Sequence, residues 1–393
     1  MGNVPHLRFP EFSGEWKKCK FGDIATGFDY GMNAAAKPFD GENKYIRITD
    51  IDEASSQYLY DDVVSPDGEL EDRYLVKEND ILLARTGAST GKSYLYRNSD
   101  GKLYFAGFLI RANIYKHNSY FVFSQLHTHR YKKWISVMSA RSGQPGINSQ
   151  EYASFPLYTT SLQEEDKIAS FLKLLDERIA TQNKIIEKLQ SLIKGLIDDI
   201  ITLKCGQLVA FETLYSKAGE GGTPTTSNTE FYDNGSIPFI KIDDLSNKYL
   251  SANKDYITEL GLKKSSAWLI PTHSIIYSNG ATIGAISINK YPVCTKQGIL
   301  GIVPNTNIDV EFLYYFMQSS YFQKEVERVV TEGTMKTAYL KDINHIKCPI
   351  PDLDRQKEIS HLLSVLSLKE DVERQLLQKY QIQKQYLLRK MFI

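Results

Sequence analysis

The stretch KIASFLKLLDERIATQNKIIEKLQSLIKGLIDDIITL, residues 167–203, decides the fold of this chain. Apolar residues recur along it at alternating spacings of four and three, which is the pattern of a coiled-coil seam. The seam positions are Ile168, Leu172, Leu175, Ile179, Gln182, Ile186, Leu189, Ile193, Leu196 and Ile200. Nine of these ten are apolar, and the polar one, Gln182, either fixes the register or is a tolerated defect. Since no proline lies between Leu162 and Pro224, we predict one helix from Leu162 to about Leu203, roughly 60 Å long at ~1.5 Å per residue.

A second stretch, Leu353 to Phe392, aligns with the first seam at a constant offset. The matching apolar residues are Ile359, Leu363, Leu366, Leu377, Tyr380, Leu387 and Met391. Glu370, Glu373 and Lys384 interrupt this seam, so we expect a local phase shift in which neighbouring apolar residues take over the packing. These neighbours are Leu368, Val372 and Leu376. We predict that the two helices pair antiparallel and bury both stripes; dimerisation of two chains through the helices is the alternative.

The rest of the chain repeats itself. "YIRITDID" (45–52) recurs as "FIKIDDLS" (239–246), an alternating segment that predicts a strand, and "RTGASTGKS" (85–93) recurs as "SNGATIGAI" (278–286). Each copy ends in a proline-containing strand, a turn and an acidic helix start, in "FPLYTTSLQEEDKIASFL" (155–172) and "CPIPDLDRQKEISHLL" (348–363).

We therefore predict an α+β fold in which two similar mixed modules are separated by two long helices, with a pseudo-twofold internal repeat. The expected segments are a first module (1–158), a spacer helix (159–204), a second module (205–352) and a C-terminal helix (353–393) that pairs with the first. The length of 393 residues and the 42% hydrophobic content suit a globular chain of two or more domains.

The turn "RTGASTGKS" looks like a phosphate-binding loop, but it has three residues between Gly87 and Gly91 where that loop needs four. The second copy keeps both glycines and has Ala285 where Lys92 stood. A loop built for nucleotide would not keep the turn and discard the lysine, so shared backbone geometry is the better interpretation. A nucleotide-binding enzyme that uses Gly87 to Ser93 remains a less favoured alternative.

Charge is segregated along the chain although the net charge is zero. Residues 1–80 hold 9 Lys/Arg against 17 Asp/Glu, whereas residues 81–150 hold 10 against one. The second half repeats the contrast more weakly, with 4 against 8 in residues 206–259 and 4 against none in residues 260–308. Such segregation fits a surface that faces a polyphosphate, or an ordinary solvated face.

Several other functions find little support in the sequence. No apolar run approaches the ~20 residues of a membrane span and no signal pattern is present, so we expect a cytoplasmic protein. The four cysteines lie far apart, which argues against a zinc or disulfide framework. The chain has no Pro-Pro, which the active-site motif of DNA methyltransferases requires. Asp40, Glu42 and Lys44 could be arranged as in a nuclease, but "FDGENK" reads better as a loop.

The chain resembles the specificity (S) subunit of a type I restriction-modification system. The matching features are the opening "VPHLRFPEF" followed by Trp16, the repeated strand, the repeated "G-A-[ST]-x-G" turn, "GEGGTP" (219–224) and both proline-then-helix junctions. The first copy departs from the pattern by having "GFDYGMN" (27–33) in place of the "GGTP" element.

The resemblance implies that each module is a target recognition domain that reads one half of a bipartite DNA sequence. The helices would set the spacing and dock two methyltransferase subunits, with restriction subunits left open as further partners. Catalysis would belong to partner subunits that carry S-adenosylmethionine and ATP-driven cleavage, so the chain itself would be non-catalytic and without cofactor or metal. A structural coiled-coil scaffold with the modules as end caps is the alternative from another class.

The candidate DNA contacts are polar side chains around the glycine turns and on two later loops, since such groups read phosphates and base edges. In the first module they are Arg85, Ser89, Thr90, Lys92, Arg97 and Lys102, with Arg141, Gln144 and Asn148 on "ARSGQPGINSQ" (140–150). In the second module they are Asn279, Thr282, Lys290, Lys296 and Gln297, with Lys336, Thr337 and Tyr339 in "EGTMKTAYL" (332–340). An ordinary solvated position is the alternative for each.

Overall fold

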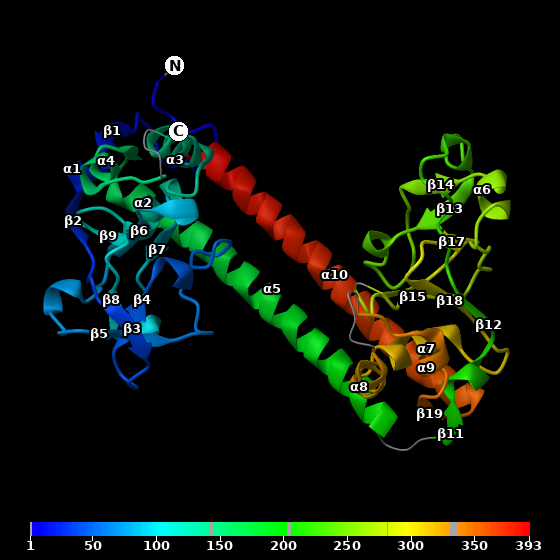
Figure 1. The fold of residues 1–393 in the computed structure, drawn as a ribbon. Helices are drawn as coiled ribbons and strands as arrows, with labels where there is room; N and C mark the ends of the chain where they lie inside the picture. Colours follow the sequence, from blue (N-terminus) through cyan, green and yellow to red (C-terminus); the bar gives the residue numbers. More distant parts are fainter. Residues whose placement is uncertain (1, 141–144, 203–205, 281, 331–335) are drawn as a thin grey trace. The chain divides into compact units, whose positions relative to one another are not determined.

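The computed structural model divides into two compact units (Figure 1). It describes residues 2–140, 145–202, 206–280, 282–330 and 336–393, and no side chain of residues 200–202. Unit 1 comprises residues 1–183 and 375–393, and unit 2 comprises residues 184–374. Each unit therefore combines one globular part with portions of two long helices, α5 (Leu162–Thr202) and α10 (Leu353–Met391).

The globular part of unit 1 is built on a four-stranded antiparallel sheet of order β2-β9-β6-β7. Two smaller pairings accompany it, the parallel pair β4-β8 and the antiparallel pair β1-β10, which joins the two ends of the globular part. A further antiparallel pair is formed by β3 and β5. The strands are β1 (Lys17–Lys20), β2 (Ala25–Tyr30), β3 (Ala35–Pro38), β4 (Lys44–Ile46), β5 (Val64–Asp67), β6 (Asp80–Ala84), β7 (Ser93–Leu95), β8 (Leu103–Phe105), β9 (Leu109–Ile114) and β10 (Pro156–Thr159). The helices are α1 (Phe21–Ile24), α2 (Ser119–Gln125), α3 (His129–Ser139) and α4 (Ser149–Ala153).

Unit 2 repeats this topology. Its main sheet has the order β12-β18-β15-β16, its parallel pair is β13-β17, and its end-joining antiparallel pair is β11-β19. The strands are β11 (Gln207–Ala210), β12 (Tyr215–Glu220), β13 (Ile237–Ile240), β14 (Asp255–Ile257), β15 (Ile275–Ser278), β16 (Ile286–Ile288), β17 (Cys294–Thr295), β18 (Ile299–Pro304) and β19 (Lys347–Ile350). The helices are α6 (Glu259–Lys263), α7 (Val310–Met317), α8 (Ser320–Val329) and α9 (Leu340–Ile343). The internal repeat predicted from the sequence is confirmed by this equality of strand order.

Each main sheet is buried on both faces, which explains why its central strand is continuously apolar. In β6, Ile81 and Leu83 pack into one core while Leu82 and Ala84 pack into another. In β15 the residues alternate in the same way, because successive side chains of a strand point to opposite faces. The core on one face of each main sheet includes residues of the long helices, so each globular part packs directly against α5 and α10.

The two long helices pair antiparallel. In unit 1 the Asp176 carboxylate lies 2.6 Å from Lys384 Nζ, and the Arg178 guanidinium lies 5.6 Å from the centre of the Tyr380 ring. Residue numbers rise along α5 as they fall along α10, so the two helices run in opposite directions. In unit 2 the end of α5 and the start of α10 share a core through Ile197, Ile359 and Leu363. The fold class predicted from the seams is thus confirmed.

The seam of α5 keeps its polar member inside. Gln182 is only 5% exposed, in line with the apolar positions before it. Towards the end of α5 the buried residue is Ile197, one place after the predicted Leu196, because a helix of 3.6 residues per turn drifts away from a strict heptad.

The expected phase shift in α10 is wrong. Of the three residues expected to take over the packing, Leu368 and Val372 are 64% and 54% exposed and only Leu376 is half-buried. Glu370, Glu373 and Lys384 stay half-buried on the seam. Charged side chains are tolerated there because they find partners, as Lys384 does with Asp176 and Glu370 does with an arginine one turn away. Their long aliphatic stems also cover apolar surface, so the helix has no need to change its phase.

The repeated "YIRITDID" and "FIKIDDLS" segments form shorter strands than the alternation predicts. After β4 and β13 the chain turns into a single 3₁₀ turn, at Ile48–Asp50 and Ile242–Asp244. The turn is stabilised in the same way in both copies, because the backbone N–H of Arg47 or Lys241 donates to an aspartate three residues later, at 2.8 Å. The predicted strand is confirmed only at the beginning of each segment, because the local carboxylate ends it.

Candidate nucleic-acid interface

The glycine turn of unit 1 connects β6 to β7 at one end of the main sheet. Gly87 and Gly91 have φ of +69° and +93°, which only glycine adopts without strain. A Cβ atom on Gly91 would lie 2.8 Å from the side chain of Ile135 in α3, so this glycine also allows a close approach. The turn is therefore a backbone device, as the comparison of the two copies predicted.

The backbone N–H groups of this turn are engaged within the protein. Gly87 donates to Pro145 O, Thr90 to Gly87 O, Gly91 to Ala84 O and Lys92 to Ser89 O, at 3.0–3.1 Å. A phosphate-binding loop presents such groups to its ligand, so these four cannot serve one in this conformation. The nucleotide-binding alternative gains no support from the geometry.

Three segments of unit 1 meet at this end of the sheet, the turn and two loops. The turn itself contacts the loop before α4, where Ile147 N–H donates to Arg85 O at 2.9 Å, and the loop before β9, where Arg85 N–H donates to Phe108 O at 3.1 Å. Asn148 caps α4 by accepting from the backbone of Glu151, and its neighbour Ser149 donates to the Tyr30 hydroxyl. Arg85, Ser89, Thr90 and Asn148 are the predicted residues that this arrangement brings together. Arg141 and Gln144 lie outside the described residues.

Two predicted residues of unit 1 lie elsewhere. Because β6 and β7 are antiparallel, Arg97 follows β7 at the opposite end of the sheet from the turn. Lys102 precedes β8, also away from the turn, and its Nζ lies 3.2 Å from Glu42. Lys92 stays near the turn but is drawn to Glu53, at 3.7 Å. A residue that lies close to the turn in the sequence can therefore lie at either end of the sheet.

Sequence reasoning missed two exposed aromatic rings at this end of the sheet. Tyr30, at the end of β2, is 43% exposed and Phe108, before β9, is 56% exposed. The guanidinium of Arg85 lies 4.9 Å from the centre of the first ring and 5.9 Å from that of the second. The sequence signal for Phe108 was its position between Gly107 and the apolar strand β9, since a large ring just outside a strand does not belong to the strand's own packing.

The equivalent end of unit 2 gathers loops in the same way. Asn279 and Gly280 both donate their N–H to Gly298 O, and Ala338 N–H donates to Asn279 O at 2.9 Å. These bonds bring together the second glycine turn, the loop between β17 and β18, and the segment before α9. The predicted residues in these three segments are Thr282, Lys296, Gln297, Lys336, Thr337 and Tyr339.

The "GGTP" element also reaches this end of unit 2. Gln297 N–H lies 3.5 Å from the hydroxyl of Thr223, and Gly298 N–H donates to Glu220 at 2.7 Å. Lys296, Gln297 and Lys336 are exposed, and in the described parts of the chain neither lysine forms an ion pair. The candidate interface of unit 2 therefore presents two exposed lysines and the amide of Gln297, with the carboxylate of Glu220 beneath them.

Two predicted residues of unit 2 do not belong to that surface. Asn279 is 1% exposed, and its side-chain amide donates to Ala338 O, so it braces the turn from inside. Lys290 follows β16 at the other end of the sheet, where its Nζ lies 4.3 Å from the centre of the Tyr249 ring. Arg97 and Lys290 thus occupy equivalent places in the two units, both remote from the glycine turns.

The two copies share a close backbone approach at a place where their sequences differ. A Cβ atom on Gly31, within "GFDYGMN", would lie 2.2 Å from Ala106 O, and one on Gly221, within "GEGGTP", would lie 2.1 Å from Thr295 O. Each glycine also donates its N–H to the first residue of the neighbouring strand, Leu109 or Ile299. The missing "GGTP" of the first copy is therefore replaced by a glycine that performs the same close approach.

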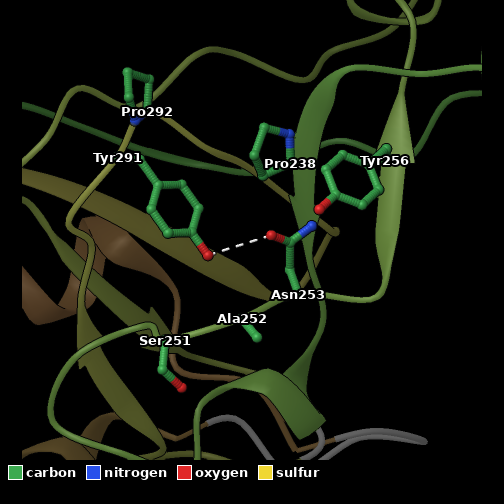
Figure 2. A pocket seen from close by; sticks show the side chains of 7 residues that line it. All are labelled: Pro238, Ser251, Ala252, Asn253, Tyr256, Tyr291 and Pro292. Atoms are coloured by element: carbon green, nitrogen blue, oxygen red, sulfur yellow. Dashed lines mark hydrogen bonds between the residues drawn. The ribbon is translucent and has the colours of Figure 1, made fainter.

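A pocket of ≈ 560 Å³ lies in unit 2. It is lined by Pro238, Ser251, Ala252, Asn253, Tyr256, Tyr291 and Pro292 (Figure 2). Figure 2 shows the Tyr291 hydroxyl pointing to Asn253, to whose side-chain oxygen it donates at 3.2 Å. Burial raises the pKa of Tyr291, and no histidine, cysteine or carboxylate lines the pocket, so its walls offer no general acid or base at neutral pH.

No catalytic constellation is visible in the parts of the chain that the structure describes. They contain no cluster of three or more metal-ligating side chains, and no helix there is long and apolar enough to cross a membrane. Burial raises the pKa of Cys294 to about 11 and that of Cys348 to about 12, which keeps both thiols protonated and unreactive. Asp40 accepts hydrogen bonds from its own loop, through Glu42 and Asn43, as expected of a turn residue.

Comparison with known sequences gives a consistent result. The profile of the "Type I restriction modification DNA specificity domain" matches residues 13–191 and 215–380. The type I restriction enzyme EcoR124I/EcoR124II specificity subunit of Escherichia coli is 30% identical over 172 residues, which is 42% of either chain. The MjaVIII specificity subunit of Methanocaldococcus jannaschii is 23% identical over 410 aligned residues, covering 96% of this chain and 91% of the relative.

Comparison with solved structures supports the fold. The chain is similar to the S subunit of a type I restriction-modification system from M. genitalium, with a TM-score of 0.61, 16% identity and 99% coverage of both chains. A second similar chain comes from a structure that addresses complex assembly and conformational transition of the type I R-M system, with a TM-score of 0.60, 13% identity and the same coverage.

Proposed function

Since this chain belongs to the family of type I restriction modification DNA specificity domains, we propose that it is the DNA specificity subunit of a type I restriction-modification complex. Its two globular parts, residues 1–158 and 205–352, each read one half of a bipartite target in double-stranded DNA. The two long helices set the number of unread base pairs between the halves.

The observation that carries this proposal is the duplicated interface. Both units bring three loops together at the same end of a sheet with the same strand order, and hold them with the same kind of backbone bonds. The scaffold of the two ends is shared while their side chains differ, with Arg85 and Asn148 in one and Lys296, Gln297 and Lys336 in the other. Equal scaffolds with unequal side chains suit two readers of two different short sequences.

The proposal assigns methylation and ATP-dependent cleavage to partner subunits and places the whole complex in the cytoplasm. Two methyltransferase subunits are the expected partners, and α5 and α10 are the expected docking elements. The described residues contain no group of three or more side chains that could hold a metal ion, and the proposal requires none from this chain.

Exchange of the first globular part tests the proposal. Residues 1–158 are replaced by the matching segment of a related specificity subunit, and the chimaera is co-expressed with the methyltransferase encoded beside this chain. We expect methylome mapping to find one half of the target changed and the other half kept. If both halves change together, the two parts are not independent readers; if the chain directs no sequence-selective methylation at all, a structural scaffold is the better interpretation.

A further inference from the structure

Arg85 is held more firmly than a surface arginine. Its backbone is bonded on both sides, to Phe108 O and from Ile147 N–H. Its Nε donates to Gly107 O at 3.2 Å, and its guanidinium lies over the ring of Tyr30, with the ring of Phe108 at 5.9 Å. A cation over an aromatic face is stabilised by the ring quadrupole, and a planar guanidinium also stacks on that face. The side chain therefore has little freedom left to lose on binding.

One of the rings beside this arginine is itself anchored. The Tyr30 hydroxyl accepts a hydrogen bond from Ser149 N–H at 3.3 Å, next to the cap residue Asn148. Although burial raises the pKa of Tyr30, that hydrogen bond and the nearby charge of Arg85 outweigh it and lower the pKa overall. The hydrogen bond from Ser149 is the main cause of the lowered pKa, and the charge of Arg85 adds to it.

The outer end of this guanidinium is unoccupied. Across the described ranges, no hydrogen bond or ion pair involves Nη1 or Nη2 of Arg85, which is half-buried. Other cations of the same unit are neutralised by carboxylates, such as Arg47 by Asp50 and Arg111 by Asp29. Arg85 is thus a fixed fork of two nitrogen atoms at the end of the sheet where the loops meet, and no carboxylate of the described residues forms an ion pair with it.

The equivalent position in unit 2 is unlike it. Ser278 occupies the place of Arg85 at the end of β15, and it is fully buried, with no hydrogen-bond partner for its hydroxyl among the residues that the structure describes. The cations of that unit come from the β17–β18 loop and the segment before α9. The two units therefore differ in the kind of group that they present from the same scaffold.

We propose that Arg85 is a specificity-determining residue that recognises a guanine in the half-sequence read by unit 1. This inference rests on the proposed function and deepens it by naming a base. Guanine presents two acceptors, O6 and N7, side by side in the major groove, and the paired Nη atoms of an arginine match them with two parallel hydrogen bonds. The serine in unit 2 cannot form that pair, so the other half-sequence has no guanine read in this way.

A base contact fits this geometry better than a phosphate contact. Phosphates are met well by flexible, fully solvated cations, since position along the backbone carries no sequence information. Arg85 instead has its Nε used and two ring centres at 4.9 and 5.9 Å from its guanidinium, which restricts the directions from which a partner can reach the two Nη atoms. Such preorganisation improves discrimination because the wrong base leaves fixed donors without a partner.

The test uses the full chain co-expressed with its methyltransferase, with the methylome as readout. We expect the half-sequence assigned to unit 1 by the module exchange to contain a G·C pair at which Arg85→Gln reduces the preference for guanine roughly 5- to 150-fold. Arg85→Lys keeps the charge but not the fork, so it should lose the same preference. Phe108→Leu removes an exposed ring outside the core and should weaken the preference to a smaller extent.

Arg73→Gln is the matched control. Its guanidinium also lies over an aromatic ring, 4.7 Å from the centre of Tyr74, but its charge is already paired with Glu71 at 2.8 Å. This variant should leave the whole target unchanged. The half-sequence read by unit 2 is the internal control for folding in every variant, because it should persist where unit 1 has lost only one base.

Three results would overturn the inference while leaving the proposed function intact. The first is a half-sequence for unit 1 that lacks a G·C pair. The second is an unchanged half-sequence in Arg85→Gln. The third is a uniform loss of binding that Arg85→Lys restores, accompanied by a salt dependence reduced by about one, which would identify a phosphate contact. Failure of the proposed function would look different, because the unmodified chain would then direct no bipartite methylation.

Discussion

The length of the helix pair should set the spacing between the two half-sequences. The perturbation is an insertion of seven residues copied from the seam into α5 after Gln190, with a second heptad in α10 after Lys369. The insertion points follow from the pairing of Asp176 with Lys384, because continuing that register places Gln190 opposite Glu370. A whole heptad keeps the apolar stripes in phase, so the seam from Ile168 onward stays buried.

The magnitude follows from the geometry of the helix. Seven residues at ~1.5 Å each add roughly 10 Å to each helix, a lengthening of about one sixth for α5, which has 41 residues. Since base pairs of B-DNA are ~3.4 Å apart, we expect the unread spacer to grow by up to about three base pairs, less if the helices lie obliquely to the DNA. Both half-sequences should be unchanged, because no residue of either globular part is altered.

The assay is methylome mapping of cells that express the variant with the methyltransferase. A three-residue insertion at the same two places is the control, since it rotates the seam, exposes Ile193 and Ile197, and should impair assembly before it alters specificity. An active heptad variant that keeps the original spacing would refute the reasoning. The helices would then not determine the distance between the half-sequences, and the two-reader proposal would stand without them.

Further predictions concern the turn, the charged surface and one buried histidine. Gly91→Ala should lower the free energy of unfolding in urea by about 1–3 kcal/mol, because the φ of Gly91 is +93° and the new Cβ would lie 2.8 Å from a neighbouring side chain. Gly87→Ala should lower it by about 1 kcal/mol, because no atom lies within 4 Å of the new Cβ. Lys296→Ala should lower the salt dependence of DNA binding by about one phosphate contact, and Lys290→Ala, at the other end of the sheet, should leave the slope unchanged. Burial and the nearby Lys384 charge lower the pKa of His127 to about 4, so the unfolded state takes up more protons below about pH 6.5. Stability should therefore fall by up to about 2 kcal/mol from pH 7 to pH 5, and His127→Gln should remove that part of the pH dependence in thermal unfolding.

The two long helices and the duplication could be derived from the sequence by itself. A helical seam is a local property, because its period depends only on backbone geometry. The stripe from Ile168 to Leu189 is buried as expected except at Ile179, which is half-buried. The repeat was legible for the same reason: the glycine turns and the proline-then-helix junctions are short motifs whose conformation is set by adjacent residues. Even so, local pattern alone placed Leu368 and Val372 inside, where the structure leaves them exposed.

The composition of the interface was decided only by the tertiary structure. Arg97 and Lys290 lie close to the glycine turns in the sequence, yet antiparallel pairing of the following strand carries each to the opposite end of its sheet. The pairing of β9 with both β2 and β6 brings Tyr30 and Phe108, 78 residues apart, to Arg85. The end of a sheet that a side chain occupies depends on strand order and register, which are set by contacts between distant segments. No local periodicity encodes those contacts, so the residues that hold Arg85 became visible only once the sheet was formed.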